Sequence, residues 1–216
     1  MFDMPVRSTS SSIARHSLLN SKRRLDADAR RSQLVEAGLA LARLVPLTEI
    51  SADDVARQAG VSKGLVFHYF PTQRDLQAAI LRRAVADMVG LLDLTPDLPV
   101  DQRLRAGLDA FIAYIEQQPI SYLSLTRGTA AVPQLQEIFE ETRSAVVGLI
   151  QRALGLETLP AGLRIAIRGW IAMVEETVLH WLDGDKPILR DQLITYLQQA
   201  AIKMLPEALE ISIQNG

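Results

Sequence analysis

The sequence contains no cysteine and no long apolar run, and these absences exclude several classes of protein. Without cysteine among its 216 residues, the chain has no disulfide, no thiolate metal site and no cysteine nucleophile. No uncharged apolar run reaches the length of about 18 residues or more that a membrane span requires. The first residues, MFDMPVRSTSSSIARHSLLNSKRR, are polar and basic where a signal peptide needs a continuous apolar core. We therefore expect a cytoplasmic protein with no membrane partner.

The chain does contain enough apolar residues for a core, and its charge is unevenly distributed. Apolar residues make up 48% and charged residues 22%, as in ordinary globular proteins. Residues 1–83 hold 13 Lys and Arg against 8 Asp and Glu, whereas residues 84–216 hold 10 against 17. A basic part joined to an acidic remainder indicates that a polyanion meets only the first part. Chance clustering of charge is the alternative.

The spacing of apolar residues predicts an all-α fold. Leu34, Ala37, Leu41 and Leu44 recur at helical steps, whereas residues 1–24 show no such period and are interpreted as a flexible basic tail. Prolines at the starts of the later segments are typical of first helical turns. The expected C-terminal helices are 101–118, 120–128, 133–154, 161–183 and 187–206. Strand alternation and internal repeats are not evident.

The stretch ISADDVARQAGVSKGLVFHYFPTQRDL predicts a helix-turn-helix. Ser51 and Asp54 form a capping-box-like start, and Gly60 ends this first helix after about two turns, where a positive φ suits glycine. Ser62 caps a second helix over 63–70, which Pro71 ends. Two short helices joined by a tight turn around a glycine are characteristic of this motif. A third helix, starting at Thr72, is expected to reach about residue 92.

The second helix has two different sides. Val66, Tyr69 and Phe70 lie 3 and 4 residues apart and are expected to face the core. Gly64 and His68 then point outward, with Leu65 and Phe67 beside them. This outward side suits the major groove of DNA, which is wide enough for a helix and presents base edges and thymine methyl groups.

These residues resemble the DNA-binding domain of TetR-family transcriptional regulators over about residues 30–81. The resemblance implies a homodimer that reads a near-palindromic operator, and it implies repression relieved by a small effector, which the mostly apolar candidate pocket predicts to be apolar or amphipathic. It divides the chain into the tail (1–24), a DNA-binding domain (25–83) and an effector-binding and dimerisation domain (84–216). The candidate DNA contacts are Ser51, Ser62, Lys63, Gly64, Leu65, Phe67, His68, Tyr69, Gln73 and Arg74.

Two positions depart from the family pattern. Phe67 stands where the family usually has tyrosine, so a hydroxyl that commonly contacts phosphate is missing. Gln73 stands where lysine is usual, although Arg74 is adjacent. Basic residues of the tail (Lys22, Arg23, Arg24) are a candidate compensation, because each neutralised phosphate adds affinity.

The remaining helices suggest an interface and a pocket. The predicted helices 161–183 and 187–206 each carry a stripe of apolar residues. These two stripes can pair with the same helices of a second subunit as a four-helix interface, or they can belong to the core of one chain. The candidate interface residues are Trp170, Met173, Thr177, Trp181, Leu193, Leu197, Ala200 and Met204. The candidate effector-pocket residues are Phe111, Tyr114, Tyr122, Thr126 and Glu175.

Two other functions are weighed against a ligand-responsive repressor. An all-α enzyme is disfavoured, because the sequence has no phosphate-binding glycine loop and no nucleophile–base pattern. The three histidines, His16, His68 and His180, show no metal-ligand spacing, so neither a metal nor another cofactor is expected. A DNA-binding regulator without an effector remains open, because pocket volume is not visible in a sequence.

Overall fold

The computed structural model describes the backbone of residues 10–92, 98–117, 133–184 and 186–214, and side chains from residue 26 to residue 206 within these ranges. Every regular element in the described ranges is helical, which confirms the all-α fold. None of the described helices is long and apolar enough to span a bilayer. The helices are α1 (Ser10–Ala42), the 3-10 helix η1 (Leu47–Glu49), α2 (Ala52–Ala59), α3 (Lys63–Tyr69), α4 (Gln73–Leu91), α5 (Val100–Gln117), α7 (Pro133–Ala153), α8 (Ala161–Asp183) and α9 (Arg190–Gln214).

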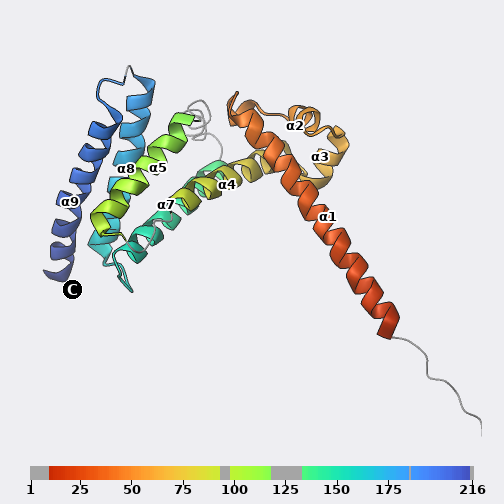
Figure 1. Ribbon diagram of the computed structural model, residues 1–216, viewed down its shortest axis with the longest axis horizontal. Helices are drawn as coiled ribbons and strands as arrows, with labels where there is room; N and C mark the ends of the chain where they lie inside the picture. The colour runs from red at the N-terminus through yellow and green to blue at the C-terminus, as the bar shows by residue number, and fades with distance from the viewer. Residues whose placement is uncertain (1–9, 93–97, 118–132, 185, 215–216) are drawn as a thin grey trace, which may run out of the picture.

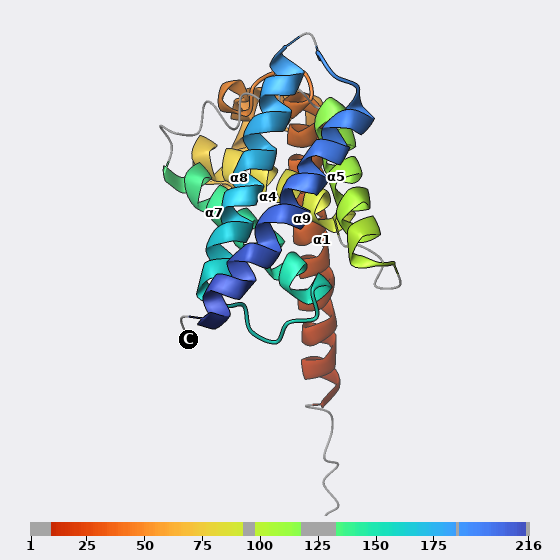
Figure 2. The same ribbon diagram turned by 90° about the vertical axis from the view of Figure 1, so that its left-hand side faces the viewer.

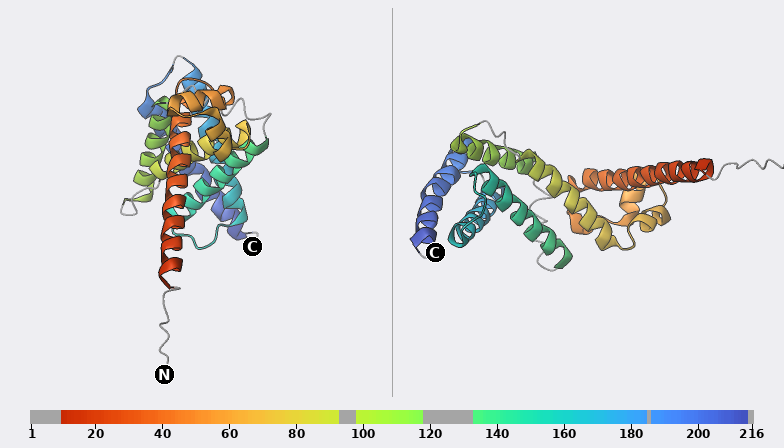
Figure 3. Two further views of the ribbon diagram at one scale, coloured as in Figure 1. Left: turned by 90° about the vertical axis from the view of Figure 1, so that its right-hand side faces the viewer. Right: turned by 90° about the horizontal axis from the view of Figure 1, so that it is seen from below.

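The helices form two ends joined by a pair of long helices. α1, α2 and α3 lie at one end, α8 and α9 lie at the other, and α4 and α7 run between them (Figure 1). The view from below shows α4 leading from the small helices towards α5 (Figure 3). The first part of α1 projects away from the rest of the molecule in the same views.

Two apolar cores correspond to these two ends. The first gathers buried side chains of α1 to α4, including Leu34, Val55, Val66 and Leu76. The second gathers α5, α8, α9, the C-terminal half of α7 and, from α4, Met88. α4 is continuous through residues 83 and 84, so the expected domain boundary falls inside a helix and stays a prediction.

α7 belongs to both cores. Leu135 and Ile138, near its start, are 1% exposed within the first core. Val147, nearer its end, is buried in the second core, and Val146 and Ile150 pack against it. A single helix therefore connects the packing of the two ends.

The structure corrects several expected helix limits. α1 begins at Ser10, so the expectation of a tail without helical structure is wrong for residues 10–24. That segment is rich in serine but has no proline or glycine to interrupt a helix. α1 ends at Ala42, which leaves Leu44 70% exposed. α9 begins at Arg190 and continues past Pro206, whereas the predicted helix 120–128 lies outside the described residues.

The predicted interface stripes are largely core residues of one chain. Trp170, Trp181, Leu193 and Leu197 are at most 6% exposed within a single protomer, so their assignment to a dimer interface is wrong. The Trp170 indole Nε1 donates to the carbonyl of Leu197 at 3.1 Å, which joins α8 to α9. The other candidates, Met173, Thr177, Ala200 and Met204, are half-buried. A stripe marks a buried face, and here that face is buried by the neighbouring helix.

Candidate nucleic-acid interface

Helix α2 begins with a complete capping box. The Ser51 hydroxyl accepts from the Asp54 N–H at 3.2 Å, and the Asp54 carboxylate accepts from the Ser51 N–H at 3.1 Å. Hydrogen bonds from the Ser51 hydroxyl and backbone hold the pKa of Asp54 below its ordinary value. Because its hydroxyl accepts from the Asp54 N–H and also donates to the Asp54 carboxylate, Ser51 would offer a phosphate little beyond the helix start that it stabilises.

The turn between α2 and α3 has the geometry that glycine permits. Gly60 has φ 67° and ψ 36°, in the left-handed region, and the Val61 N–H donates to the carbonyl of Ala56 at 2.9 Å. This confirms the positive φ expected at Gly60. The Ser62 hydroxyl then accepts from the Leu65 N–H at 3.3 Å and caps α3.

A buried glutamine holds the segment before α2 in place. Gln77 of α4 is 7% exposed, and its amide Nε2 donates to the carbonyls of Thr48 and Ile50 at 3.2 and 3.1 Å. These bonds satisfy loop carbonyls that would otherwise be costly to bury. They fix the start of α2 against α4, and no local motif in the sequence around Gln77 predicts this role.

Helix α3 divides into a buried and an exposed side as predicted. Val66 and Phe70 are 0% and 2% exposed, and Tyr69 is half-buried against the same core. Leu65 is half-buried, while Lys63, Gly64, Phe67 and His68 are exposed. The exposed residues form one surface of α3, and the opposite side of the helix is fixed by its buried residues.

Gly64 is not required by the packing of the protein itself. A Cβ built at this position would meet only the Ser62 hydroxyl oxygen, at 4.0 Å. Glycine within a helix costs about 1 kcal/mol relative to alanine. The fold therefore gains nothing from glycine here, and any benefit must come from a partner that approaches the helix closely.

Lys63, a candidate phosphate contact, is paired within the protein. Its Nζ lies 2.5 Å from the carboxylate of Asp53, and both side chains are 53% exposed. Such an exposed ion pair contributes about 0–1 kcal/mol, so a phosphate can replace the carboxylate at little cost. Lys63 also lies 5.9 Å from the centre of the Phe67 ring, which places a cation beside an exposed aromatic face.

Helix α4 starts with a second capping box beside this surface. The Thr72 hydroxyl accepts from the Asp75 N–H at 3.1 Å and donates to the Asp75 carboxylate at 2.7 Å. The bond from Thr72 lowers the pKa of Asp75 below its ordinary value. Gln73 and Arg74 are exposed in the first turn, where helix N–H groups and positive charge favour anions.

α1 adds basic residues that lie outside the predicted set of DNA contacts. Arg31 lies over the ring of Phe70 at 5.0 Å, and Arg30 donates to Gln33 at 2.5 Å. Gln33 in turn donates to the carbonyl of Ala59, next to the turn. The run ARR at 29–31 was the available signal, but its position beside α3 depends on the packing of α1.

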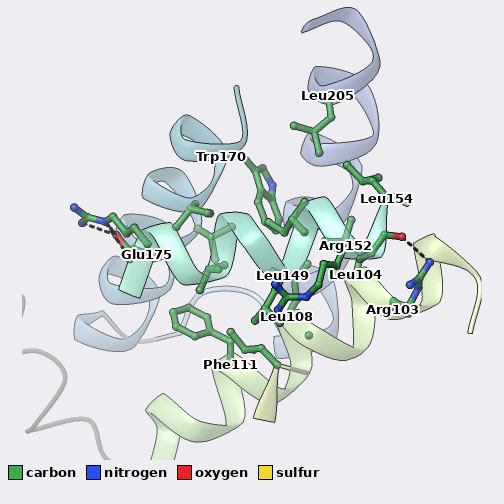
Figure 4. Close-up of a pocket in the computed structure, with 18 of the residues that line it drawn as sticks. Arg103, Leu104, Leu108, Phe111, Leu149, Arg152, Leu154, Trp170, Glu175 and Leu205 are labelled. Carbon is green, nitrogen blue, oxygen red and sulfur yellow. Dashed lines mark hydrogen bonds and ion pairs between the residues drawn. The ribbon is translucent and has the colours of Figure 1, made fainter. Parts of the chain in front are cut away.

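The second feature of functional interest is a cavity among the C-terminal helices. It has a volume of about 370 Å³ and is lined from α4, α5, α7, α8 and α9 (Figure 4). Of the predicted pocket residues, Phe111 and Glu175 line it, whereas Tyr114 does not, since its hydroxyl donates to the carbonyl of Ala84 at 2.9 Å. Tyr122 and Thr126 lie outside the described residues.

The polar groups do not suggest a metal centre. In the described part of the chain, no three His, Asp or Glu side chains come close enough together to hold a metal ion. Glu175 is instead paired with Arg143 at 2.7 Å, and the hydrogen bonds that Arg143 donates to Glu175 raise the pKa of the Arg143 guanidinium.

Comparison with known proteins places both parts of the chain in one family. Residues 34–80 match the model of bacterial regulatory proteins of the tetR family, and residues 100–204 match the tetracyclin repressor-like C-terminal domain. The chain is 30% identical to the HTH-type transcriptional activator FasR of Mycolicibacterium smegmatis, over 79% of this chain and 80% of FasR. It is 39% identical to the regulator BetI of Pectobacterium atrosepticum over 82 residues, which are 36% of this chain and 42% of BetI.

A solved structure shows the same architecture. A tetR-family transcriptional regulator from Streptomyces coelicolor superposes with a TM-score of 0.73 and 28% identity, covering 87% of this chain and 89% of that protein. The likeness therefore extends over both cores.

Proposed function

Since the chain belongs to the TetR family of bacterial transcriptional regulators, we propose that it represses transcription as a homodimer on a near-palindromic operator and is released by a small effector. The observation that carries this proposal is the exposed surface of α3, on which Gly64 has open space around it. That α3 surface sits on a helix whose opposite side is buried.

We assign α3 to the major groove. Gly64 would allow close approach, His68 would contact a base edge or a phosphate, and Leu65 and Phe67 would touch thymine methyl groups. Ser62, Lys63, Arg74 and the N–H groups at the starts of α3 and α4 would contact phosphates and set the register. Arg31 extends this basic surface along α1.

The dimer interface is assigned to the exposed side of α8 and α9. The candidate residues of this outer face are Ile165, Gly169 and Ala172 of α8, and Tyr196 and Ile202 of α9. Ile165, Tyr196 and Ile202 are 73%, 57% and 45% exposed. Both helices run uncovered across the side shown in Figure 2. Pairing of two copies there would present two α3 helices to half-sites about 34 Å apart or a multiple of it.

The cavity is assigned to the effector. Ligand sites usually have volumes of about 300–1,000 Å³ and mostly apolar walls, and this cavity meets both criteria. One end of each of the helices α4 and α7 lines the cavity, and the other end of each helix packs in the first core. An effector that binds one arrangement of these helices better than another would change operator affinity by that difference.

Binding to the DNA upstream of its own gene tests the proposal. We expect fluorescence anisotropy to give tight binding that weakens with salt, and a footprint with two-fold symmetry. His68→Ala and Lys63→Ala should each weaken binding about tenfold, with unchanged thermal unfolding. Arg43→Ala, which removes an exposed arginine at the end of α1, serves as a control. Equal binding by the wild type and both α3 variants would contradict the assignment of α3.

Activation is a second candidate, because the relative FasR is named an activator. A transcriptional reporter driven by the bound promoter distinguishes repression from activation. Higher expression after deletion of the regulator supports repression, and lower expression supports activation.

A further inference from the structure

One arginine at the wall of the cavity has far fewer partners than its charge requires. The Arg103 Nη2 of α5 donates to the carbonyl of Ala153 at 2.8 Å. Its Nε is shut off from solvent and has no acceptor among the described residues. No carboxylate of the described chain pairs with it, although a guanidinium has five donors. Arg103 is half-buried, and a buried donor that lacks an acceptor is costly.

A second cation lines the same cavity from another helix. Arg152 of α7 is exposed, and within the described ranges no carboxylate lies at ion-pair distance from it. It comes from the last turn of α7, next to the carbonyl that Arg103 contacts. Arg103 and Arg152 therefore concentrate positive charge where the loop after α7 borders the cavity.

The other end of the cavity is electrically balanced. Glu175 lies there, across from Arg103 in Figure 4, and is held by Arg143. Glu140 completes the network by accepting from Arg143 at 2.8 Å and from Arg168 at 2.5 Å. Among the residues that the structure describes, the positive charge at the Arg103 end therefore has no carboxylate as a counterpart.

The wall between the two ends is apolar. It is formed by Leu104, Leu108, Phe111, Trp170, Ile171 and Val174. Hydrocarbon placed there gains about 0.8 kcal/mol for each methylene removed from water. Such a wall offers few hydrogen-bonding groups to a polar or multiply hydroxylated molecule.

We propose that the cavity binds an amphipathic anion, namely a single hydrocarbon chain that ends in a carboxylate or a phosphate. The chain occupies the apolar wall, and the anionic group lies at the Arg103 end, where exposed Arg152 marks the entrance. Arginine suits this role because its planar donors match the oxygens of either group. This inference rests on the assignment of the cavity to the effector.

Calorimetry with ligands that share one chain length tests the head group. Dodecanoate, dodecyl phosphate and dodecanol, each below its micelle concentration, should bind in a defined order. We expect both anions to bind at least about tenfold more tightly than dodecanol. The stronger of the two anions identifies the head group. Equal affinity for dodecanol and dodecanoate would overturn the proposal.

Two variants on the same helix locate the effect. Arg103→Met should remove most of the preference for dodecanoate over dodecanol, with Arg152 still present, and should leave dodecanol binding unchanged. Arg105→Met is the matched control, because Arg105 pairs with Asp191 and Thr195 of α9 and does not line the cavity. An undiminished preference for anions in Arg103→Met would contradict the assignment. Thermal unfolding should show that both variants fold.

Operator binding by the same samples separates this inference from the proposed function. If the protein binds its operator but none of the three ligands, the regulator assignment stands and the proposed ligand class is wrong. If it binds dodecanoate through Arg103 but no DNA, the ligand class stands and the operator assignment is wrong.

Discussion

At the scale of single residues, Gly64 separates stability from DNA binding. Nothing in the protein occupies the position of its missing Cβ, so Gly64→Ala should stabilise the fold by up to about 1 kcal/mol. The same methyl group would stand between α3 and the groove, and we expect operator affinity to fall roughly tenfold. Thermal unfolding and anisotropy measure the two effects. Gly90→Ala in α4, also with open space around it, should stabilise the protein without changing DNA binding.

A substitution at Phe67 is expected to strengthen operator binding rather than weaken it. It is 38% exposed beside Lys63, and a hydroxyl added to its ring would extend from the α3 surface towards a phosphate. Phe67→Tyr should therefore strengthen operator binding severalfold, since a hydrogen bond to a charged group contributes about 1.5–3 kcal/mol before other costs. Phe67→Leu, which adds no donor, is the comparison. A gain that is equal in both variants would show that the hydroxyl makes no contact.

Residue-level predictions succeeded where the signal was local. The two sides of α3 and the positive φ of Gly60 follow from spacing and from the chemistry of glycine. Gln77 could not be predicted, because its two acceptors lie 27 and 29 residues away along the chain. Arg103 was missed for a related reason, since the apolar cavity around it exists only after five helices have packed.

At the scale of elements, the DNA-binding end depends on short helices with strong starts. α2, α3 and α4 each begin with a side-chain cap. These caps matter most in α2 and α3, which have 8 and 7 residues, because helices this short are unstable alone. We expect Thr72→Ala to cost about 1 kcal/mol of unfolding free energy, with urea unfolding as the measurement.

The capping carboxylates make the same end sensitive to acid. The pKa values of Asp54 and Asp75 are lowered in the folded protein, so their contribution to stability is fully present above the unfolded value of 3.8. It is lost as the pH falls through their folded pKa values. Asp75→Asn should therefore destabilise the protein at pH 7 and have little effect near pH 2, as judged by thermal unfolding. A difference that is the same at both pH values would show that the charge of Asp75 contributes nothing.

Element boundaries could be predicted wherever a cap or a breaker stood at the boundary. The starts of α2, α3, α4 and α7 fall within a residue of Ser51, Ser62, Thr72 and Pro133. Residues 10–24 lack an apolar stripe, so the sequence contains no packing signal for the extended start of α1. The passage of α9 through Pro206 was likewise hidden, because proline is normally a sign that a helix ends.

At the scale of the whole molecule, we expect the exposed side of α8 and α9 to decide the oligomeric state. Ile165→Asp would place a charge on the outer face, and burying an unpaired charge is costly. We expect light scattering after gel filtration to show a monomer, with operator affinity reduced because two half-sites are no longer bound together. Leu44→Asp alters a similarly exposed side chain, 70% against 73%, which follows α1 at the DNA-binding end. It should remain dimeric.

The packing of the whole molecule explains why the apolar stripes of α8 and α9 did not identify the dimer interface. The periodicity of α8 and α9 correctly marked their buried faces, but an amphipathic pattern does not identify the partner. Trp170 and Leu197 pair within one chain, and the surface left for a second copy is the less apolar one. Its residues, such as Gly169 and Ala172, carry little hydrophobic signal.

Because α7 packs in both apolar cores, it links the proposed effector cavity to the DNA-binding end. Ile138 and Ile150 lie 12 residues apart, so about 18 Å of continuous helix connects the first core to the wall of the cavity. Any effector whose affinity depends on the position of this helix must obey thermodynamic reciprocity. The factor by which the effector weakens the operator complex is the same factor by which operator DNA weakens effector binding. Calorimetric titration of one ligand in the presence of the other would therefore yield the coupling free energy of the two sites from either direction.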